Sequence, residues 1–315
     1  MKSSDFSAVR KKKTIFERIK QELYRNRYLY ILSVPVISYY LIFCYAPMFG
    51  LTIAFKNYSL AKGVFASEWV GIKYFKEFFS GIFFKRTLTN TLLISFYDLI
   101  FGFPIPIIFA LMMNQLKNAA FKRVVQTATY LPHFISTVVI CGMIADFFGN
   151  GGAISQVLQN FGGADINYIG SERFFRPIYI ITNIWQSVGW NSIIYLSALA
   201  AVDVQLYEAA EIDGAGWFKQ LIHVTLPGIM STVVIMLILR IGQLLSVGYE
   251  KIILLYSPAT YSVADVISSY VYRMGISGSR YSYSAAVGLF QSIVNVVLLV
   301  TANAFSKRYS ETALF

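Results

Sequence analysis

Six long apolar runs limit what this chain can fold into more than any other feature. Each is long enough for a helix to cross the hydrocarbon core of a bilayer, which is about 30 Å thick and takes roughly 20 apolar residues. The runs are Tyr28–Phe55, Leu88–Met113, Val124–Phe148, Ile178–Val202, Gly228–Tyr249 and Ser284–Phe305. The sequence therefore predicts an all-α polytopic membrane protein with six transmembrane helices, whose transmembrane domain covers residues 28–305.

The composition supports a membrane protein and excludes two other classes. Only 14% of the residues are charged and the mean hydropathy is +0.56, whereas soluble domains carry about 25% charged residues. These values exclude an ordinary soluble enzyme and a disordered chain. The two cysteines, Cys44 and Cys141, lie in apolar runs, so we expect no disulfide framework. With only two histidines in the chain, we expect no metal site.

Basic residues predict the orientation of the chain. Residues 1–27 contain nine Lys and Arg side chains, and the cytoplasmic flanks of membrane spans carry such an excess. Six basic residues in segment 56–87 oppose this orientation, but long loops cross the membrane largely regardless of charge. We therefore expect a multi-pass protein of the cell membrane with both termini, residues 1–27 and 306–315, in the cytoplasm. These flanks account for much of the net charge of +11, and no nucleic-acid partner is expected.

The N-terminal segment also has an amphipathic pattern. Ile15, Phe16, Ile19 and Leu23 make an apolar face among basic residues, which suits a helix lying on anionic membrane lipid. An alternative explains the pattern equally well: the basic residues of this segment only set the orientation of the chain in the membrane.

Residues 203–227 form the second cytoplasmic connection, and their pattern predicts two short helices. Asp203 is placed to cap the first helix, and Gly214 permits a sharp turn before the second. Pro227 is expected to end the second helix just before the fifth span. The second helix has an apolar face at helical spacing, made by Trp217, Leu221 and Val224. A cytoplasmic helical hairpin of this kind offers an apolar and acidic surface to a partner's groove.

This loop resembles the EAA loop of permease subunits in type I binding-protein-dependent ABC importers. The resemblance rests on Glu208-Ala209-Ala210, Asp213-Gly214-Ala215 and, eleven residues later, Leu226-Pro227. In that family the loop seats in a cleft of the ATPase subunit, so the resemblance implies that Glu208 and Asp213 make polar contacts or caps. The full set of implied coupling residues is Tyr207, Glu208, Ala209, Ala210, Asp213, Gly214, Ala215, Leu226 and Pro227. Val204 departs from the proline that many relatives carry at its position.

Other segments resemble a narrower group, the LplB-type polysaccharide permeases, which are related to the maltose-transporter permeases. These segments are Tyr45–Gly50, Ala54–Tyr58, Trp69–Gly71 and Leu131–Ser136. The resemblance implies import of an oligosaccharide or polysaccharide fragment by alternating access. It also implies a second homologous permease in a heterodimer, two ATPase subunits that hold ATP and Mg, and an extracellular substrate-binding lipoprotein.

Polar residues inside two spans are candidates for the substrate pathway. In the fourth span, Asn183, Gln186 and Trp190 share one helical stripe, with Asn191 on its border. Such a stripe faces protein or water, because polar groups in hydrocarbon are costly. It either lines the pathway or makes hydrogen bonds between helices.

The fifth span adds Arg240 and Gln243, which lie on one face. A charge at the centre of a span costs about 2.5–3.5 kcal/mol on insertion scales, so Arg240 must be paired or face water. It either lines the pathway and binds an acidic group of the cargo, or pairs with an acid of the partner permease, Asp98 or Asp146. His133 is expected to be a hydrogen-bonded packing residue rather than a proton carrier. Glu250 and Lys251 are expected at the outer boundary, within reach of a docked binding protein.

The chain contains no P-loop motif and no nucleophile or metalloprotease motif, so the sequence predicts a transport subunit rather than an enzyme. Two other classes remain open. One is a secondary sugar transporter driven by an ion gradient, which would show inverted repeats and mid-membrane carboxylates. The other is a membrane receptor or scaffold. Co-purification with a P-loop ATPase separates the three.

Overall fold

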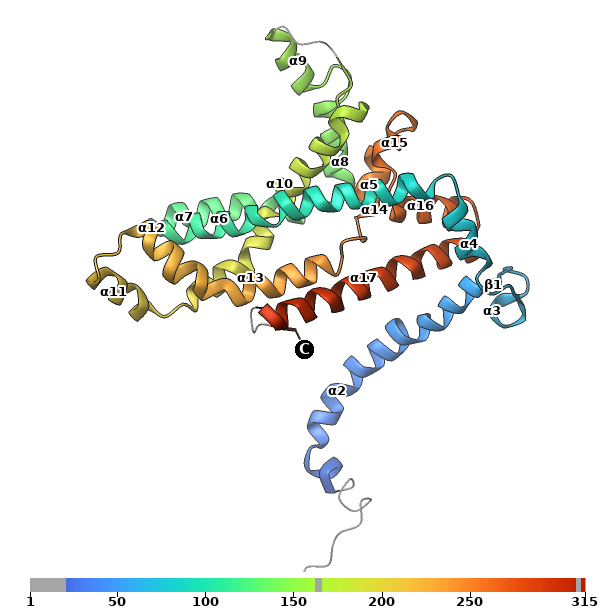
Figure 1. Ribbon diagram of the computed structural model, residues 1–315, viewed down its shortest axis with the longest axis horizontal. Coiled ribbons are helices and arrows are strands. Elements are labelled where there is room, and N and C mark those ends of the chain that lie inside the picture. Colours follow the sequence, from blue (N-terminus) through green and yellow to red (C-terminus); the bar gives the residue numbers. More distant parts are fainter. Residues whose placement is uncertain (1–20, 162–165, 310–312, 315) are drawn as a thin grey trace, which may run out of the picture.

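The computed structural model describes residues 21–161, 166–309 and 313–314, and this part of the chain is helical apart from one short hairpin. The hairpin pairs β1 (Lys56–Asn57) with β2 (Glu68–Trp69) in antiparallel fashion. Figure 1 shows long helices running side by side along the longest axis of the molecule, with the hairpin at one end and the helices of the 203–227 loop at the other.

The α-helices of the described residues are α2 (Arg27–Tyr39), α3 (Gly63–Ala66), α4 (Lys73–Ser80), α5 (Phe84–Tyr97), α6 (Pro104–Gln115), α7 (Ala119–Tyr130), α8 (Thr137–Phe148), α9 (Ala153–Asn160), α10 (Glu172–Ala200), α11 (Val204–Ile212), α12 (Trp217–Gln220), α13 (Leu226–Ile241), α14 (Tyr249–Leu255), α15 (Tyr261–Ala264), α16 (Ile267–Tyr272) and α17 (Tyr281–Tyr309). The 3₁₀ segments are η2 (Ala46–Phe55), η4 (Leu131–Phe134) and η6 (Pro258–Thr260). The π-helical segments are η1 (Tyr40–Tyr45), η3 (Asp98–Gly102), η5 (Leu221–Thr225) and η7 (Arg273–Ser277).

Five continuous helical stretches in the described part of the chain are long and apolar enough to cross a membrane. Helix α10 meets the same criteria of length and apolarity only together with α11, which is bent from it by 66°, so the described residues contain five or six candidate spans. The prediction of an all-helical membrane protein is therefore confirmed, and its six spans agree with the upper of these two counts. The five stretches are Arg27–Phe55, Phe84–Gln115, Thr137–Val157, Trp217–Ile241 and Tyr281–Arg308.

The third predicted span is interrupted, so its prediction as one helix over Val124–Phe148 is wrong. The chain forms α7, the short segment η4, and then α8, whose first turn is capped by the hydroxyl of Ser136. Pro132 within η4 has no backbone N–H to continue the ladder of α7. The apolar run continues through the break, which is why hydropathy alone did not reveal it.

The helices around the fifth span also differ from the prediction. Pro227 does not end the second helix of the loop, because α12, η5 and α13 follow one another as a single stretch from Trp217 to Ile241. The π-helical turn η5 lies immediately before α13, where the missing N–H of a proline in the first turn costs little. The predicted span Gly228–Tyr249 instead ends at Ile241.

Segment 250–283, which follows the predicted fifth span, packs back into the bundle. Helix α14 contacts α8 and α16, and α16 in turn contacts α5 and α17. Ile252, Val266 and Ile267 are fully buried. Burial of these apolar side chains contributes about 25 cal/mol per Å² of apolar surface removed from water. This burial is the driving force that holds the short helices α14, α15 and α16 in place.

Helix α10 is the centre of the packing. It contacts α5, α6, α7, α13 and α15. Its approach to α7 depends on Gly189, because a Cβ atom there would lie 2.3 Å from the carbonyl oxygen of Thr129. Next to the loop, Ala110, Tyr195 and Ile229 form a buried cluster from α6, α10 and α13.

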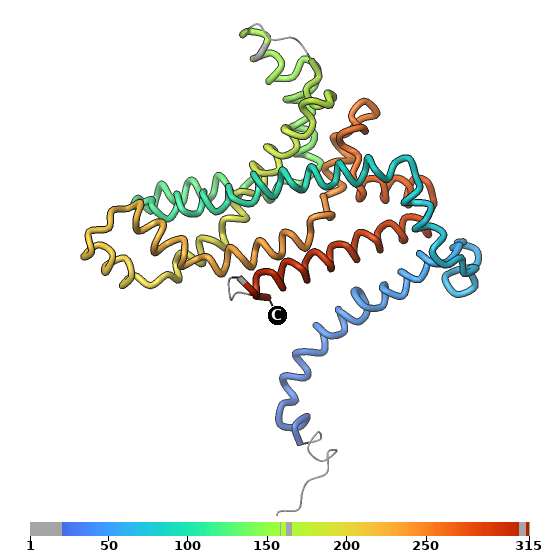
Figure 2. The backbone as a smooth tube through the Cα atoms, viewed as in Figure 1, coloured from blue at the N-terminus to red at the C-terminus, as the bar shows by residue number. Residues whose placement is uncertain are grey.

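The first span stands apart from this body. Figure 2 shows its tube meeting the bundle near the hairpin and diverging from α17 toward the N-terminus. Segment η2 packs on α17, whereas α2 has no buried residue. An apolar helix with no buried face contacts lipid or another subunit. The predicted amphipathic face at Ile15, Phe16 and Ile19 lies outside the described residues.

Candidate functional site

The 203–227 loop is a helical hairpin held by local hydrogen bonds. The carboxylate of Asp203 accepts a hydrogen bond of 2.9 Å from the backbone N–H of Gln205, which confirms its predicted capping role. Gly214 has a φ of +72°, a conformation that only glycine adopts without cost, and this confirms the predicted turn. The hydroxyl of Tyr207 donates to Thr225 at 3.0 Å and joins α11 to η5. The hairpin is therefore built to keep its shape.

The outer surface of this loop has no partner within the described residues. Ile212 is 86% exposed, and Trp217 and Phe218 are more than half exposed. Glu208 and Asp213 are exposed beside them. Large apolar side chains gathered at an exposed tip and rimmed by acids are typical of a protein-binding surface. Of the other predicted coupling residues, Ala209 and Pro227 are also exposed, and Ala210, Ala215 and Leu226 are half-buried.

A cavity of about 360 Å³ lies between α5, α10, α13 and α14. It brings together four of the six predicted pathway residues, Asn183, Gln186, Arg240 and Gln243. Its volume falls within the range of about 300–1,000 Å³ that is typical of small-molecule sites. The full lining is Ile94, Ser95, Asp98, Thr137, Tyr179, Asn183, Gln186, Arg240, Gln243, Leu244, Ser246, Val247, Gly248, Tyr249, Glu250 and Lys251.

An ion pair crosses one wall of this cavity. Arg240, in the last turn of α13, pairs with Asp98 at the start of η3. Asn183 of α10 donates to the same carboxylate at 3.0 Å. The sequence left open whether Arg240 binds the cargo or pairs with an acid of the partner permease, Asp98 or Asp146. In the structure it pairs with Asp98. Together with Asn183, the pair joins α13, η3 and α10, and its two charges neutralise each other.

The floor of the cavity is an unwound segment, residues 242–248, between α13 and α14. Its backbone polar groups are bonded by side chains: Asn295 accepts from the N–H of Leu245 at 3.1 Å, and Gln291 donates to its carbonyl at 2.8 Å. Ser95 donates to the carbonyl of Leu244. Non-helical backbone at membrane depth is tolerated where protein or a water-filled cavity satisfies it, and this segment meets that condition.

Lys251 lines the cavity and is buried, so its side chain is not open to a docked binding protein in the way that the sequence suggested. Only 6% of the residue is exposed, because α14 folds back between α8 and α16. Its neighbour Glu250 lines the same cavity and is exposed. Sequence analysis missed Lys251 and the unwound segment, although the polar residues Gln243 and Ser246 between Gly242 and Gly248 are a signal of an interrupted helix.

Trp190 and Asn191 are not among the residues that line this cavity. Both are exposed on α10, further toward the loop. The indole of Trp190 stacks on the ring of His133, with ring centroids 4.5 Å apart and planes at 6°. His133 thus packs on α10 as predicted, but its ring is exposed and the expected hydrogen bond is absent among the described residues.

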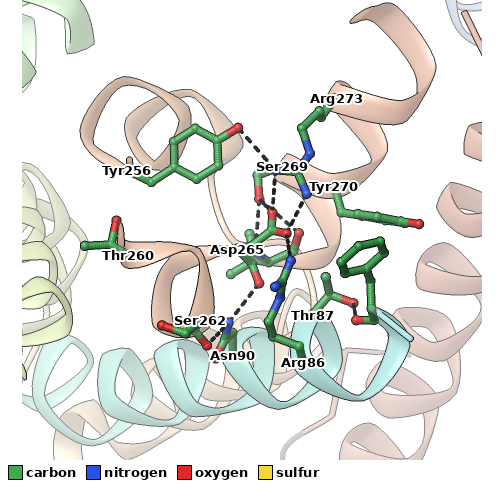
Figure 3. A network of polar contacts seen from close by, with 12 residues as sticks. Arg86, Thr87, Asn90, Tyr256, Thr260, Ser262, Asp265, Ser269, Tyr270 and Arg273 are labelled. Carbon is green, nitrogen blue, oxygen red and sulfur yellow. Dashed lines mark hydrogen bonds and ion pairs between the residues drawn. The ribbon is translucent and has the colours of Figure 1, made fainter. Parts of the chain in front are cut away.

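A buried carboxylate, Asp265, ties the segment after α15 to the ends of three other helices (Figure 3). Its side chain is completely buried and pairs with Arg273 at 2.6 Å and Arg86 at 3.1 Å. Burial alone lowers the pKa of Arg273, but the hydrogen bonds and charge of Asp265 outweigh this, so its pKa lies above the usual value. Asn90 of α5 donates to the backbone carbonyl of Asp265 and accepts from Arg176 of α10 at 2.8 Å. These bonds hold α15 and α16 over the cavity end of the bundle.

The sequence and fold match those of a known family. The family model described as "Binding-protein-dependent transport system inner membrane component" matches residues 102–311. The chain belongs to this family. The matched region contains the 203–227 loop and the helices α10, α13 and α14 around the cavity. The chain is thus a multi-pass inner-membrane permease subunit of an ABC importer and not its ATPase, as the sequence predicted.

Individual relatives cover almost the whole chain. Protein LplB of Bacillus subtilis (strain 168) is 44% identical over 294 residues, covering 93% of this chain and 92% of the relative. The polygalacturonan/rhamnogalacturonan transport system permease protein YteP of the same organism is 40% identical over 321 residues, with full coverage of both chains. The predicted resemblance to LplB-type permeases is therefore confirmed.

A solved structure matches the fold over the same length. It is a crystal structure of a bacterial alginate ABC transporter in complex with an alginate pentasaccharide-bound periplasmic protein. The superposition has a TM-score of 0.87 at 40% identity and covers 95% of this chain and 100% of that chain. The permease architecture thus extends beyond the matched family region to the first span.

Proposed function

We propose that this permease moves an oligosaccharide or polysaccharide fragment into the cell by alternating access. A second homologous permease completes the pore as a heterodimer, and two ATPase subunits that bind ATP and Mg drive it. An extracellular binding lipoprotein delivers the saccharide. The names of the relatives and of the solved alginate transporter support the substrate class, and the aromatic and amide groups around the cavity suit a sugar's apolar faces and hydroxyls.

The 203–227 loop is the observation that carries this proposal. Its exposed apolar tip needs a partner, and its hairpin is continuous with α13 on one side and separated from α10 by a bend of 66° on the other. Force applied to the loop is therefore transmitted through α12 and η5 into α13, whose other end carries Arg240 at the cavity. We place the loop and both termini in the cytoplasm, where the ATPase subunits are.

A substitution in the loop tests this coupling. Gly214→Ala meets no steric obstacle, because no atom lies within 4 Å of the position that its Cβ would take, but a left-handed conformation costs a non-glycine residue about 1–2 kcal/mol. We expect lower ATPase stimulation and lower saccharide uptake in the reconstituted importer. Gly216→Ala, whose φ is −68° and whose surroundings are equally open, is the matched control. Unchanged uptake and ATPase activity in Gly214→Ala and in a charge-removing Glu208→Gln variant would refute the coupling role.

An ion-gradient mechanism, the alternative from sequence, calls for a mid-membrane carboxylate that exchanges ions. Asp98, the acid that lines the cavity within the spans, is bound to Arg240 and Asn183. Uptake into vesicles that depends on nucleotide and not on an imposed proton or sodium gradient supports the ABC mechanism. Uptake driven by such a gradient without nucleotide would contradict it.

A further inference from the structure

Lys251 is a buried cation that the described part of the chain does not pair with an acid. Only 6% of the residue is exposed, and lysine is almost never buried to this extent without a partner. The ion pairs among the described residues involve Asp98, Asp265 and Glu77, and none includes Lys251. Its position at the cavity wall therefore needs a physical explanation.

The neighbours of the amine hold it in place without neutralising it. The Nζ atom donates to the amide oxygen of Gln186 at 3.5 Å, a long contact for a charged donor, and lies 5.6 Å from the ring centroid of Tyr179. The backbone of Lys251 is held separately, because the Cys141 sulfur of α8 lies 3.9 Å from its carbonyl oxygen. An ammonium group has three N–H donors, and the contact with Gln186 uses one of them.

The charges around the cavity leave this cation uncompensated. Arg240 and Asp98, which line the same cavity, neutralise each other. Glu250, the remaining acid of the lining, is exposed and forms no ion pair within 4 Å among the described residues. Burial lowers the pKa of Lys251 to about 8, so most of the amines remain protonated at pH 7.

The cavity can admit an anionic group to this position. Its volume of about 360 Å³ exceeds what a single small ion needs, and Tyr249, which also lines it, is 41% exposed and offers a ring for a sugar face to pack against. Gln186 and Asn183 from the same helix offer hydrogen bonds to hydroxyls. A ligand that fits all of these groups is a sugar ring bearing a carboxylate.

We propose that Lys251 binds the carboxylate of a uronic-acid unit of the saccharide in transit and so favours acidic over neutral sugars. This inference rests on the proposed import of saccharides and adds the residue that recognises an acidic one. Removing the amine is expected to weaken binding of an acidic saccharide about tenfold, the scale of a hydrogen bond to a charged group, and to leave a neutral saccharide unaffected.

The test uses the complete importer, with both permeases and the ATPase subunits, in lipid nanodiscs. Oligogalacturonate and oligomannuronate are titrated into the complex, each beside its carboxyl-reduced, neutral counterpart. We expect the wild-type complex to bind at least one acid form about tenfold more tightly than its reduced form, and Lys251→Gln to lose this difference. Lys251→Arg should retain part of it. Lys85→Gln, which removes an exposed lysine outside the cavity, is the matched control and should behave as wild type.

Three results would overturn the role of Lys251. The wild-type complex would show no preference for either acid form, or Lys251→Gln would keep the preference, or it would weaken acidic and neutral forms equally. The last result, with a lower melting temperature of the complex, would mean that Lys251 pairs with the second permease. ATP-driven uptake, measured after the same complex is reconstituted with its binding protein in sealed liposomes, keeps the two proposals apart. If the wild type takes up no saccharide, the proposed function fails; if uptake persists, only the role of Lys251 fails.

Discussion

Replacing Asp265 by asparagine removes the charge at the centre of the network that holds α15 and α16 against the bundle. The carboxylate accepts hydrogen bonds from Arg273 at 2.6 and 3.2 Å, from Arg86 at 3.1 Å and from Ser269 at 2.9 Å. Asparagine keeps the shape but replaces one accepting oxygen by a donating amide. At least one guanidinium then faces a donor, and two positive charges lose their counterion.

The magnitude follows from the burial of this carboxylate, whose side chain is completely buried. Removing one partner of a buried ion pair costs about 3–5 kcal/mol. With a dependence of roughly 2–4 °C per kcal/mol for chains somewhat shorter than this one, we expect a melting temperature lower by about 6–20 °C. The assay is thermal unfolding of the purified importer, followed by intrinsic fluorescence.

A matched control and a double variant complete this experiment. Asp146→Asn removes an exposed acid of α8 and should leave the melting temperature within about 2 °C of wild type, as expected for surface substitutions. Adding Arg273→Gln to Asp265→Asn should cost less than the sum of the two single changes, because the lost partner is shared. An Asp265→Asn variant that melts like the Asp146→Asn control would refute the reasoning.

Three further predictions concern the helix packing and the cavity. Gly189→Ala places a Cβ atom 2.3 Å from the carbonyl oxygen of Thr129 and should destabilise the complex by about 1–3 kcal/mol; a melting temperature equal to that of wild type would contradict the close contact between α10 and α7. Asp98→Asn and Arg240→Gln should each reduce uptake by leaving a lone charge, and the double variant should recover part of it; strictly additive losses would show that the two residues do not act as a pair. Because the protonated amine of Lys251, with a pKa of about 8, is the form that binds a carboxylate, affinity for acidic saccharides should be retained below that pH and fall above it, with neutral saccharides unaffected; an equal fall for both in a binding titration would count against the role of Lys251.

Local signals predicted those parts of the structure that depend on local chemistry. The uninterrupted apolar runs in the first, second and sixth spans gave the helices Arg27–Phe55, Phe84–Gln115 and Tyr281–Arg308. The capping role of Asp203 depends only on a carboxylate two residues before a backbone N–H. The turn at Gly214 depends on the freedom of one residue. None of these features needs a distant part of the chain.

Features set by tertiary contacts could not be predicted in this way. Helices α14, α15 and α16 have only four to seven residues, too few to be stable by themselves, and they form because they pack on α5, α8 and α10. Lys251 lies in such a helix, so the hydropathy of the sequence could not predict that it is buried. The free-energy cost of an unpaired charge inside a span showed that Arg240 needs a partner or water. Which acid pairs with it could be known only from the tertiary structure, which brings Asp98 next to it.

Contact between the 203–227 loop and the ATPase tests the central claim most directly. Ile212, at the exposed tip of the loop, is changed to cysteine in a variant that lacks Cys44 and Cys141, and a photoactivatable maleimide is attached in the assembled importer. The account predicts a covalent product with the ATPase subunit whose yield changes when nucleotide is bound. Labelling of the same cysteine from outside intact cells by a membrane-impermeant maleimide, or the absence of any ATPase product in an active complex, would contradict it.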